Sequence, residues 1–183
     1  LVCGIFISGI FYLWIYHGLR YGYEAERPST ETFETVSTEE TITQEFIARE
    51  YYLKGIEFVF INLAEDGNGE LDFRVLDSDG RIKANSEIAI SSVTAGEWEF
   101  IPLRVRLKAG ESYILEISAK DCSIPPYVLA REKGTVGENT VLTASGAETS
   151  LELLNAYGFA VSASRLERLL ITVMLAVCLF GLW

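Results

Sequence analysis

Two apolar runs without charged residues enclose an acidic central region in this chain of 183 residues. Residues 1–19 lack Asp, Glu, Lys and Arg. As a helix rising about 1.5 Å per residue, they would extend roughly 28 Å, close to the hydrocarbon thickness of a bilayer. Residues 169–183 also lack charge, but as a helix they would extend only about 22 Å. We therefore expect a transmembrane helix at 1–19 and the truncated start of a second one at 165–183, as in a piece of a longer membrane protein.

All charged side chains lie between Arg20 and Arg168, where 26 acidic and 15 basic residues give a formal net charge of −11. This stretch has the usual length of one domain with a core of its own. A surface this acidic does not suit the phosphate backbone of DNA or RNA, which is bound by basic patches. We expect one water-exposed domain whose partner is the membrane lipid bilayer, and no nucleic-acid partner.

Residues 20–41 are rich in Thr and Glu and contain few apolar side chains. This composition is typical of a hydrated segment that cannot bury a core. We expect a stalk here, between the first span and the domain. The alternative is an irregular edge of the domain, on which Phe33 and Val36 would dock.

From Ile42 onward, apolar and polar residues alternate with the period of a half-buried strand. Leu71, Phe73 and Val75 share one face of such a run, and Asp72 shares the other face with Arg74. Turns that contain Gly separate the runs about every ten residues, with no amphipathic helical pattern between them. The pattern predicts about eight or nine short strands in a mainly β, antiparallel β-sandwich over residues 42–164.

Aromatic side chains of the central region are candidates for binding sugar rings, because aromatic faces pack against apolar faces of saccharides. The ligand-binding candidates are Tyr51, Tyr52 and Trp98. In an extended chain Tyr51 and Tyr52 point in opposite directions, which makes one of them a surface residue. Trp98 and Phe100 share a strand face, and we expect the orientation that buries both.

An acidic turn supplies oxygen atoms at alternate positions, from Asp66, Asn68 and Glu70. This spacing resembles part of a calcium-binding loop, so these three residues are candidate ligands of a structural calcium ion. Asp-Gly and Asn-Gly are also the residues that a tight hairpin turn requires, and we favour the turn. No other cofactor is expected.

The residue types needed for nucleophilic catalysis do not come together in the central region. The single histidine, His17, lies in the first apolar run, so no Ser or Cys of the domain can have a histidine base. Cys122 is the only cysteine between the two runs, whereas a zinc site needs several Cys or His at set spacings. We expect no catalytic residues. A glycosidase-like pair of carboxylates stays open, because the many acidic residues single out no pair.

Several segments of the central region together resemble a known jelly-roll pattern. They are Ile42–Phe46, Leu53–Phe58, Gly69–Gly80, Trp98–Phe100 and Gly110–Ile117. The pattern is similar to that of extracytoplasmic domains inserted between the first two spans of bacterial multi-pass membrane proteins, many of them associated with cell-envelope polysaccharide synthesis. The resemblance covers roughly residues 42–130 and implies a jelly-roll-like sandwich. Its motifs are strand and turn positions, so it transfers no catalytic residues.

Two signals disagree about the side of the membrane on which the domain lies. Arg20, Arg27, Arg165 and Arg168 flank the spans on the domain side, which favours the cytoplasm. That rule weakens for connecting segments longer than about 60 residues, and the resemblance implies an outward-facing domain. We therefore expect the cell membrane as the location, with the soluble domain extracytoplasmic.

The leading functional hypothesis is a non-catalytic, carbohydrate-binding-like or scaffolding domain of a larger integral membrane protein. That protein would be a glycosyltransferase or polymerase of envelope glycans, with a cell-envelope glycan as the partner of this domain. The first alternative is the ectodomain of a sensor or adhesin that binds a protein. The second is a surface glycoside hydrolase that uses two carboxylates.

Overall fold

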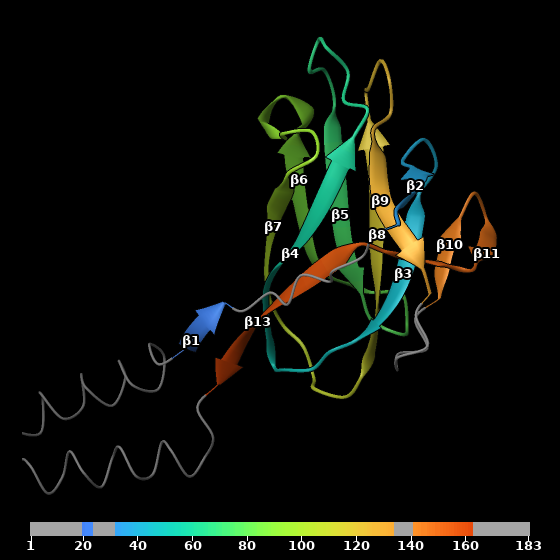
Figure 1. Cartoon of the computed structure of the whole chain (residues 1–183). Helices are drawn as coiled ribbons and strands as arrows, with labels where there is room; N and C mark the ends of the chain where they lie inside the picture. The colour runs from blue at the N-terminus through green and yellow to red at the C-terminus, as the bar shows by residue number, and fades with distance from the viewer. Residues whose placement is uncertain (1–19, 24–31, 134–140, 163–183) are drawn as a thin grey trace, which may run out of the picture. The chain divides into compact units, whose positions relative to one another are not determined.

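The computed structural model describes residues 20–23, 32–133 and 141–162 (Figure 1). The chain divides into two compact units, one of Leu1–Tyr23 with Ala160–Trp183 and one of Glu24–Phe159. In the smaller unit, the described residues form an antiparallel pair between β1 (Arg20–Tyr23) and the end of β13 (Asn155–Ser162). The remaining described elements belong to the larger unit.

The described part of the larger unit consists of strands and one short 3-10 helix, which confirms the mainly β prediction. The strands are β2 (Glu34–Ser37), β3 (Ile42–Ile47), β4 (Tyr52–Ile61), β5 (Glu70–Leu76), β6 (Ile82–Ala89), β7 (Trp98–Arg106), β8 (Ser112–Lys120), β9 (Tyr127–Glu132), β10 (Leu142–Ala144), β11 (Ala147–Thr149), β12 (Leu151–Leu153) and the first part of β13. The helix η1 (Ile90–Ser92) joins β6 to β7. The sequence pattern does not predict β2, β11 or β13, so the structure has more strands than expected.

Most strands are paired as nested antiparallel hairpins. The pair β5·β6 is innermost, and β4·β7, β3·β8 and β2·β9 enclose it in that order along the chain. These pairs distribute over two antiparallel sheets, one with the order β2-β9-β4-β7 and one with the order β3-β8-β5-β6. The short strands β10 and β11 extend the second sheet beyond β3.

The two sheets pack face to face in a sandwich-like arrangement (Figure 1). Apolar side chains fill the space between them. Phe73 of β5 stacks on Phe58 of β4 with ring centroids 5.8 Å apart, and it meets Phe60 edge-on at 6.2 Å. Leu71 and Val75 are fully buried beside Phe73, as the alternating pattern predicts. Burial of this layer is the main source of stability, at about 25 cal/mol for each Å² of apolar surface.

The end of the larger unit's chain fills a split in the first sheet. β9 pairs with β4 only at Phe60 and Ile61. Beyond that point β12 pairs with β9 and β13 pairs with β4, so residues 151–159 fill the space between the two strands. Gln44 of the opposite sheet accepts a hydrogen bond of 2.7 Å from the buried amide of Leu153. This contact ties the inserted segment to the facing sheet.

The structure bears on the predicted stalk but does not describe the predicted spans. The proposed stalk at 20–41 is wrong for its second half, because β2 pairs with β9 and Val36 is buried in the core. Thr38 is fully buried as well, and its hydroxyl donates to the carbonyl of Pro126. This segment therefore belongs to the domain, as the alternative expected, but it forms a regular strand and not an irregular edge, and Phe33 stays 51% exposed. The predicted spans at 1–19 and 165–183 lie outside the described residues, and within those that are described we find no helix with the length and hydropathy of a membrane span.

Replacing Gln44 with Met should lower the free energy of unfolding by about 1–3 kcal/mol, because the amide of Leu153 would stay buried without its acceptor. The matched control is Thr43→Val on the neighbouring, half-buried position of β3, for which a change below about 0.5 kcal/mol is expected. Urea denaturation of the whole chain in a non-ionic detergent, followed by circular dichroism, measures both. Equal losses in the two variants would contradict the importance of this contact.

Candidate functional site

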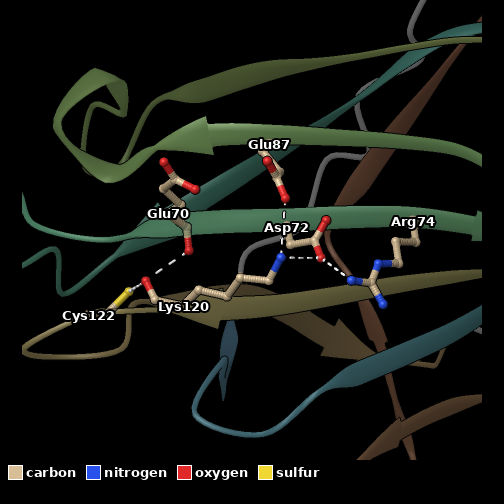
Figure 2. Close-up of polar contacts among 6 residues, drawn as sticks. All are labelled: Glu70, Asp72, Arg74, Glu87, Lys120 and Cys122. Atoms are coloured by element: carbon tan, nitrogen blue, oxygen red, sulfur yellow. Dashed lines mark hydrogen bonds and ion pairs between the residues drawn. The ribbon is translucent and has the colours of Figure 1, made fainter.

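A buried carboxylate organises the outer face of the second sheet (Figure 2). Asp72 lies on β5 with only 2% of its surface exposed. Its Oδ2 atom lies 2.7 Å from Arg74 Nη2 and 2.8 Å from Lys120 Nζ, at ion-pair distances without hydrogen-bond angles. Lys120 also donates a hydrogen bond of 3.2 Å to Glu87 on β6. Strand register explains the cluster, because Asp72 lies directly opposite Glu87.

This charged cluster is balanced and lacks a group suited to catalysis. Two carboxylates, Asp72 and Glu87, face two cations, Arg74 and Lys120, which leaves no net charge to attract an ionic substrate. The contact with Asp72 and the hydrogen bond to Glu87 raise the pKa of Lys120, so its amine stays protonated and cannot act as a base or nucleophile. The cluster is best explained as a set of ion pairs that stabilises the packing of β5, β6 and β8.

Cys122 borders the cluster but is not activated as a nucleophile. Its thiol is half-buried and contacts the carbonyl oxygen of Lys120 at 3.2 Å (Figure 2). Desolvation by burial raises the pKa of this thiol, whereas a reactive cysteine needs a lowered pKa. A Cβ atom added to Gly69 would come within 2.5 Å of its sulfur. The thiol is therefore a packed, half-buried group.

In the acidic turn at 66–70, the Asp66 carboxylate accepts hydrogen bonds from protein groups. Asp66 accepts hydrogen bonds from the backbone and side-chain nitrogens of Asn68, at 3.1 and 3.0 Å. It also accepts one from the Ser123 hydroxyl at 3.1 Å. The hydrogen bond from the Asn68 amide is the main reason why the pKa of Asp66 is lowered. Among the described residues no group of three or more His, Cys, Asp or Glu side chains could hold a metal ion.

The candidate aromatic residues do not share one surface. Tyr51 is 64% exposed and Tyr52 is half-buried, and both lie at the start of β4. Trp98 lies opposite Val59, seven residues further along β4, which is about 23 Å at the usual rise of a strand. The three residues therefore cannot bind one small ligand together.

Trp98 and Phe100 lie on the outer face of the first sheet, so the prediction that both are buried is wrong. Ile101, Leu103 and Val105 occupy the inward positions of β7, and alternation directs Trp98 and Phe100 outward. Phe100 is 44% exposed and Trp98 is half-buried. Sequence reasoning overlooked a usable signal, namely the unbroken aliphatic series at every second position of β7.

Small residues lie next to Phe100 on this side of the sheet, and they are themselves buried, with Ala156 only 2% exposed. Phe100 lies opposite Glu57, and Glu57 lies opposite Ala156 of β13. One row further along, Gly55 lies opposite Gly158. A Cβ atom at position 55 would clash with the carbonyl oxygen of Ile101 and come within 2.5 Å of the Phe100 ring, so the ring rests directly over the backbone. The buried carboxylate of Glu57, 5% exposed, lies beside it. We name Trp98, Phe100, Gly55, Glu57 and Ala156 the outer aromatic face.

A scan against protein-family models finds no match to this chain, and a search of curated proteins finds none either.

Replacing Lys120 with Met should lower the free energy of unfolding, because the buried Asp72 carboxylate loses one of its two cations. Lys108→Met is the matched control, since Lys108 and Glu111 form an ion pair with exposed side chains, 76% and 53%. The loss of this exposed pair should lower the urea midpoint less than the loss of Lys120. Urea denaturation of both variants measures the difference, and an equal cost would count against a role for burial.

The lowered pKa of Asp66 predicts how the turn responds to acid. Its contribution to stability is present above the ordinary pKa of 3.8 and is lost as the pH falls through the lower folded-state pKa. Ser123→Ala removes one donor and should raise this pKa, while the Asn68 amide still holds it below 3.8. Ser92→Ala, whose hydroxyl donates to Ala89 instead, should leave it unchanged. NMR titration of the Asp66 carboxyl carbon measures all three midpoints, and an unaltered midpoint in Ser123→Ala would contradict the assigned contact.

Proposed function

We propose that this chain is an extracytoplasmic jelly-roll module of a larger membrane protein and that it binds or scaffolds envelope glycans without catalysing a reaction. The nested strand pairs and the orders β2-β9-β4-β7 and β3-β8-β5-β6 support the jelly-roll assignment, because two interlocked Greek keys produce this arrangement. The charge-free runs at 1–19 and 169–183 support the membrane location.

The outer aromatic face is the observation that carries the proposed function. An exposed aromatic ring held rigidly over small residues offers the flat apolar surface on which a sugar ring stacks. Glu57 lies directly opposite Phe100 on the neighbouring strand but is only 5% exposed, so the proposal rests on the aromatic rings. Tyr51 and Tyr52 lie too far from Trp98, about 23 Å along β4, to bind one small sugar together with it.

The absence of a catalytic arrangement among the described residues supports a binding role over a hydrolytic one. Lys120 is neutralised by its carboxylate partners and the Cys122 thiol has a raised pKa. The Asp66 carboxylate accepts two hydrogen bonds from Asn68 in its own loop and one from Ser123 in the β8–β9 loop. These groups hold the fold and are not directed toward a substrate.

Glycan binding is tested with the whole chain in lipid nanodiscs, applied to an array of bacterial envelope polysaccharide fragments. We expect binding that Phe100→Ala and Trp98→Ala weaken by at least about tenfold, since stacked aromatic anchors dominate such sites. Ile124→Ala is the matched control, because Ile124 is similarly exposed, 50%, but lies in the β8–β9 loop.

Three results would contradict the proposal. The first is no binding to any fragment, and the second is an equal loss of binding in the control variant. The third is the release of new reducing ends from a bound polysaccharide, which would identify a hydrolase instead.

A further inference from the structure

We propose that one end of the sandwich docks against the headgroups of an anionic lipid bilayer, an orientation that rests on the membrane location proposed above. This end consists of the β3–β4, β5–β6 and β7–β8 loops with the strand residues next to them (Figure 1). The loops belong together because the Leu107 amide donates to Tyr51 O at 3.0 Å and the Gly110 amide donates to Ala48 O at 2.7 Å. Leu76, which precedes the β5–β6 loop, lies opposite Ile114 of β8, next to the β7–β8 loop. We name this end of the sandwich the basic end.

Cationic side chains are concentrated at this end. They are Arg49, Lys54, Arg81, Lys83, Arg104, Arg106 and Lys108. Apart from the half-buried Lys54, all are exposed. Carboxylates are also present, and two of them pair locally, Asp79 with Arg81 and Glu111 with Lys108. Over residues 47–54, 76–83 and 104–112, these seven cations and the four carboxylates Glu50, Asp77, Asp79 and Glu111 give a net charge of +3, although that of the chain is negative.

The opposite end of the sandwich has the opposite character. Its loops meet through a hydrogen bond from the Thr38 amide to Pro126 O and another from the Gly96 amide to Phe60 O. Those loops contain Glu39, Glu40, Glu65, Asp66, Glu97 and Asp121, with no Lys or Arg in the described residues 38–41, 62–69, 90–97 and 121–126. An anionic surface therefore attracts one end and repels the other, which aligns the strands with the membrane normal.

The length of the chain limits the distance between the basic end and the second charge-free run. Within the larger unit β13 runs along β4 toward its start, and its last residue there, Phe159, lies opposite Leu53. Leu169, where the second charge-free run begins, follows Phe159 by ten residues, which span at most about 35 Å when fully extended. The tether therefore limits how far the basic end can move from the bilayer, while β4 separates the acidic end by about 33 Å more.

Exposed apolar side chains at the basic end fit a headgroup layer better than bulk water. Tyr51 is 64% exposed, Ile82 is 57% exposed and Ile47 is 43% exposed. Tyrosine is enriched at membrane interfaces, where its ring lies among headgroups and its hydroxyl stays hydrated. Cations beside such residues add electrostatic attraction, which acts only within a Debye length of about 8 Å at physiological salt. The tether brings the end within reach, and the cations then hold it there.

Hydrogen exchange of the whole chain in nanodiscs tests the proposal, with discs of phosphatidylcholine alone compared with discs that also contain phosphatidylglycerol. Amides of residues 48–51, 77–81 and 107–111 should exchange more slowly in the anionic discs, and the difference should vanish at about 0.5 M NaCl, where the Debye length is only a few Å. Amides of 62–69 and 121–126 should exchange equally in both discs, and they report that the fold is intact.

Two matched triple variants separate a local effect from one of net charge. Arg49→Gln, Lys83→Gln and Arg106→Gln together should weaken the docking equilibrium strongly, at about fivefold for each cation. Glu39→Gln, Glu65→Gln and Asp121→Asn together change the net charge by the same amount in the opposite direction, at the far end of the sandwich. They should alter the protection of amides at the basic end far less.

The outcomes distinguish this inference from the membrane location on which it rests. A chain that inserts into both discs but exchanges equally in them overturns the docking and leaves the membrane location standing. Equal and opposite effects of the two triple variants also overturn it, since net charge alone would then explain the attraction. A chain that inserts into neither disc overturns the membrane location and the orientation together.

Discussion

The aromatic layer between the sheets is the contact on which the rest of the larger unit depends. Phe73 of β5 meets Phe58 and Phe60 of β4, and the two strands belong to different sheets. Because side chains alternate along a strand, placing these residues inward fixes which positions face outward. A shift of one residue would bury Asp72 and Arg74 in this layer and expose Phe73. The same alternation on β7 directs Phe100 to the surface, so the core specifies the outer aromatic face indirectly.

Nested pairing then explains why charge and aromatic residues separate so clearly. Each enclosing pair adds both of its strands to the same sheet, and successive pairs alternate between the two sheets. Among these pairs, only β5·β6 is closed by a tight turn, at Asp77–Gly80. The other pairs join distant residues, as β2 does with β9, so they require the core to form. Loops consequently gather at two opposite ends, and residues far apart in sequence share each end. The insertion of residues 151–159 between β4 and β9 directs the chain out at one of these ends.

Local patterns predicted what depends on one strand at a time. The inward set Leu71, Phe73 and Val75 was predictable because period-two alternation is a property of a single strand. The β2 strand was missed since its four residues have one buried apolar side chain, Val36, and only pairing with β9 orders them. The aromatic character of Trp98 alone predicts burial, whereas the buried aliphatic series Ile101, Leu103 and Val105 directs Trp98 outward. Arg104 adopts a left-handed φ of 51° where β7 bulges against β4, which no pattern of residue types indicates.

The separation of Tyr51 from Trp98 follows from the length of β4 and gives the two residues different roles. Tyr51 lies at the start of this strand, among the cations of the basic end, whereas Trp98 pairs near its finish. If the basic end rests on the bilayer, the strands stand along the membrane normal and both outer sheet faces open sideways to water. The outer aromatic face is then held above the lipid surface, where a long polymer lying parallel to the membrane can cross it. The proposed membrane docking and the proposed glycan binding would thus use different parts of one strand ladder, so that both could occur at once.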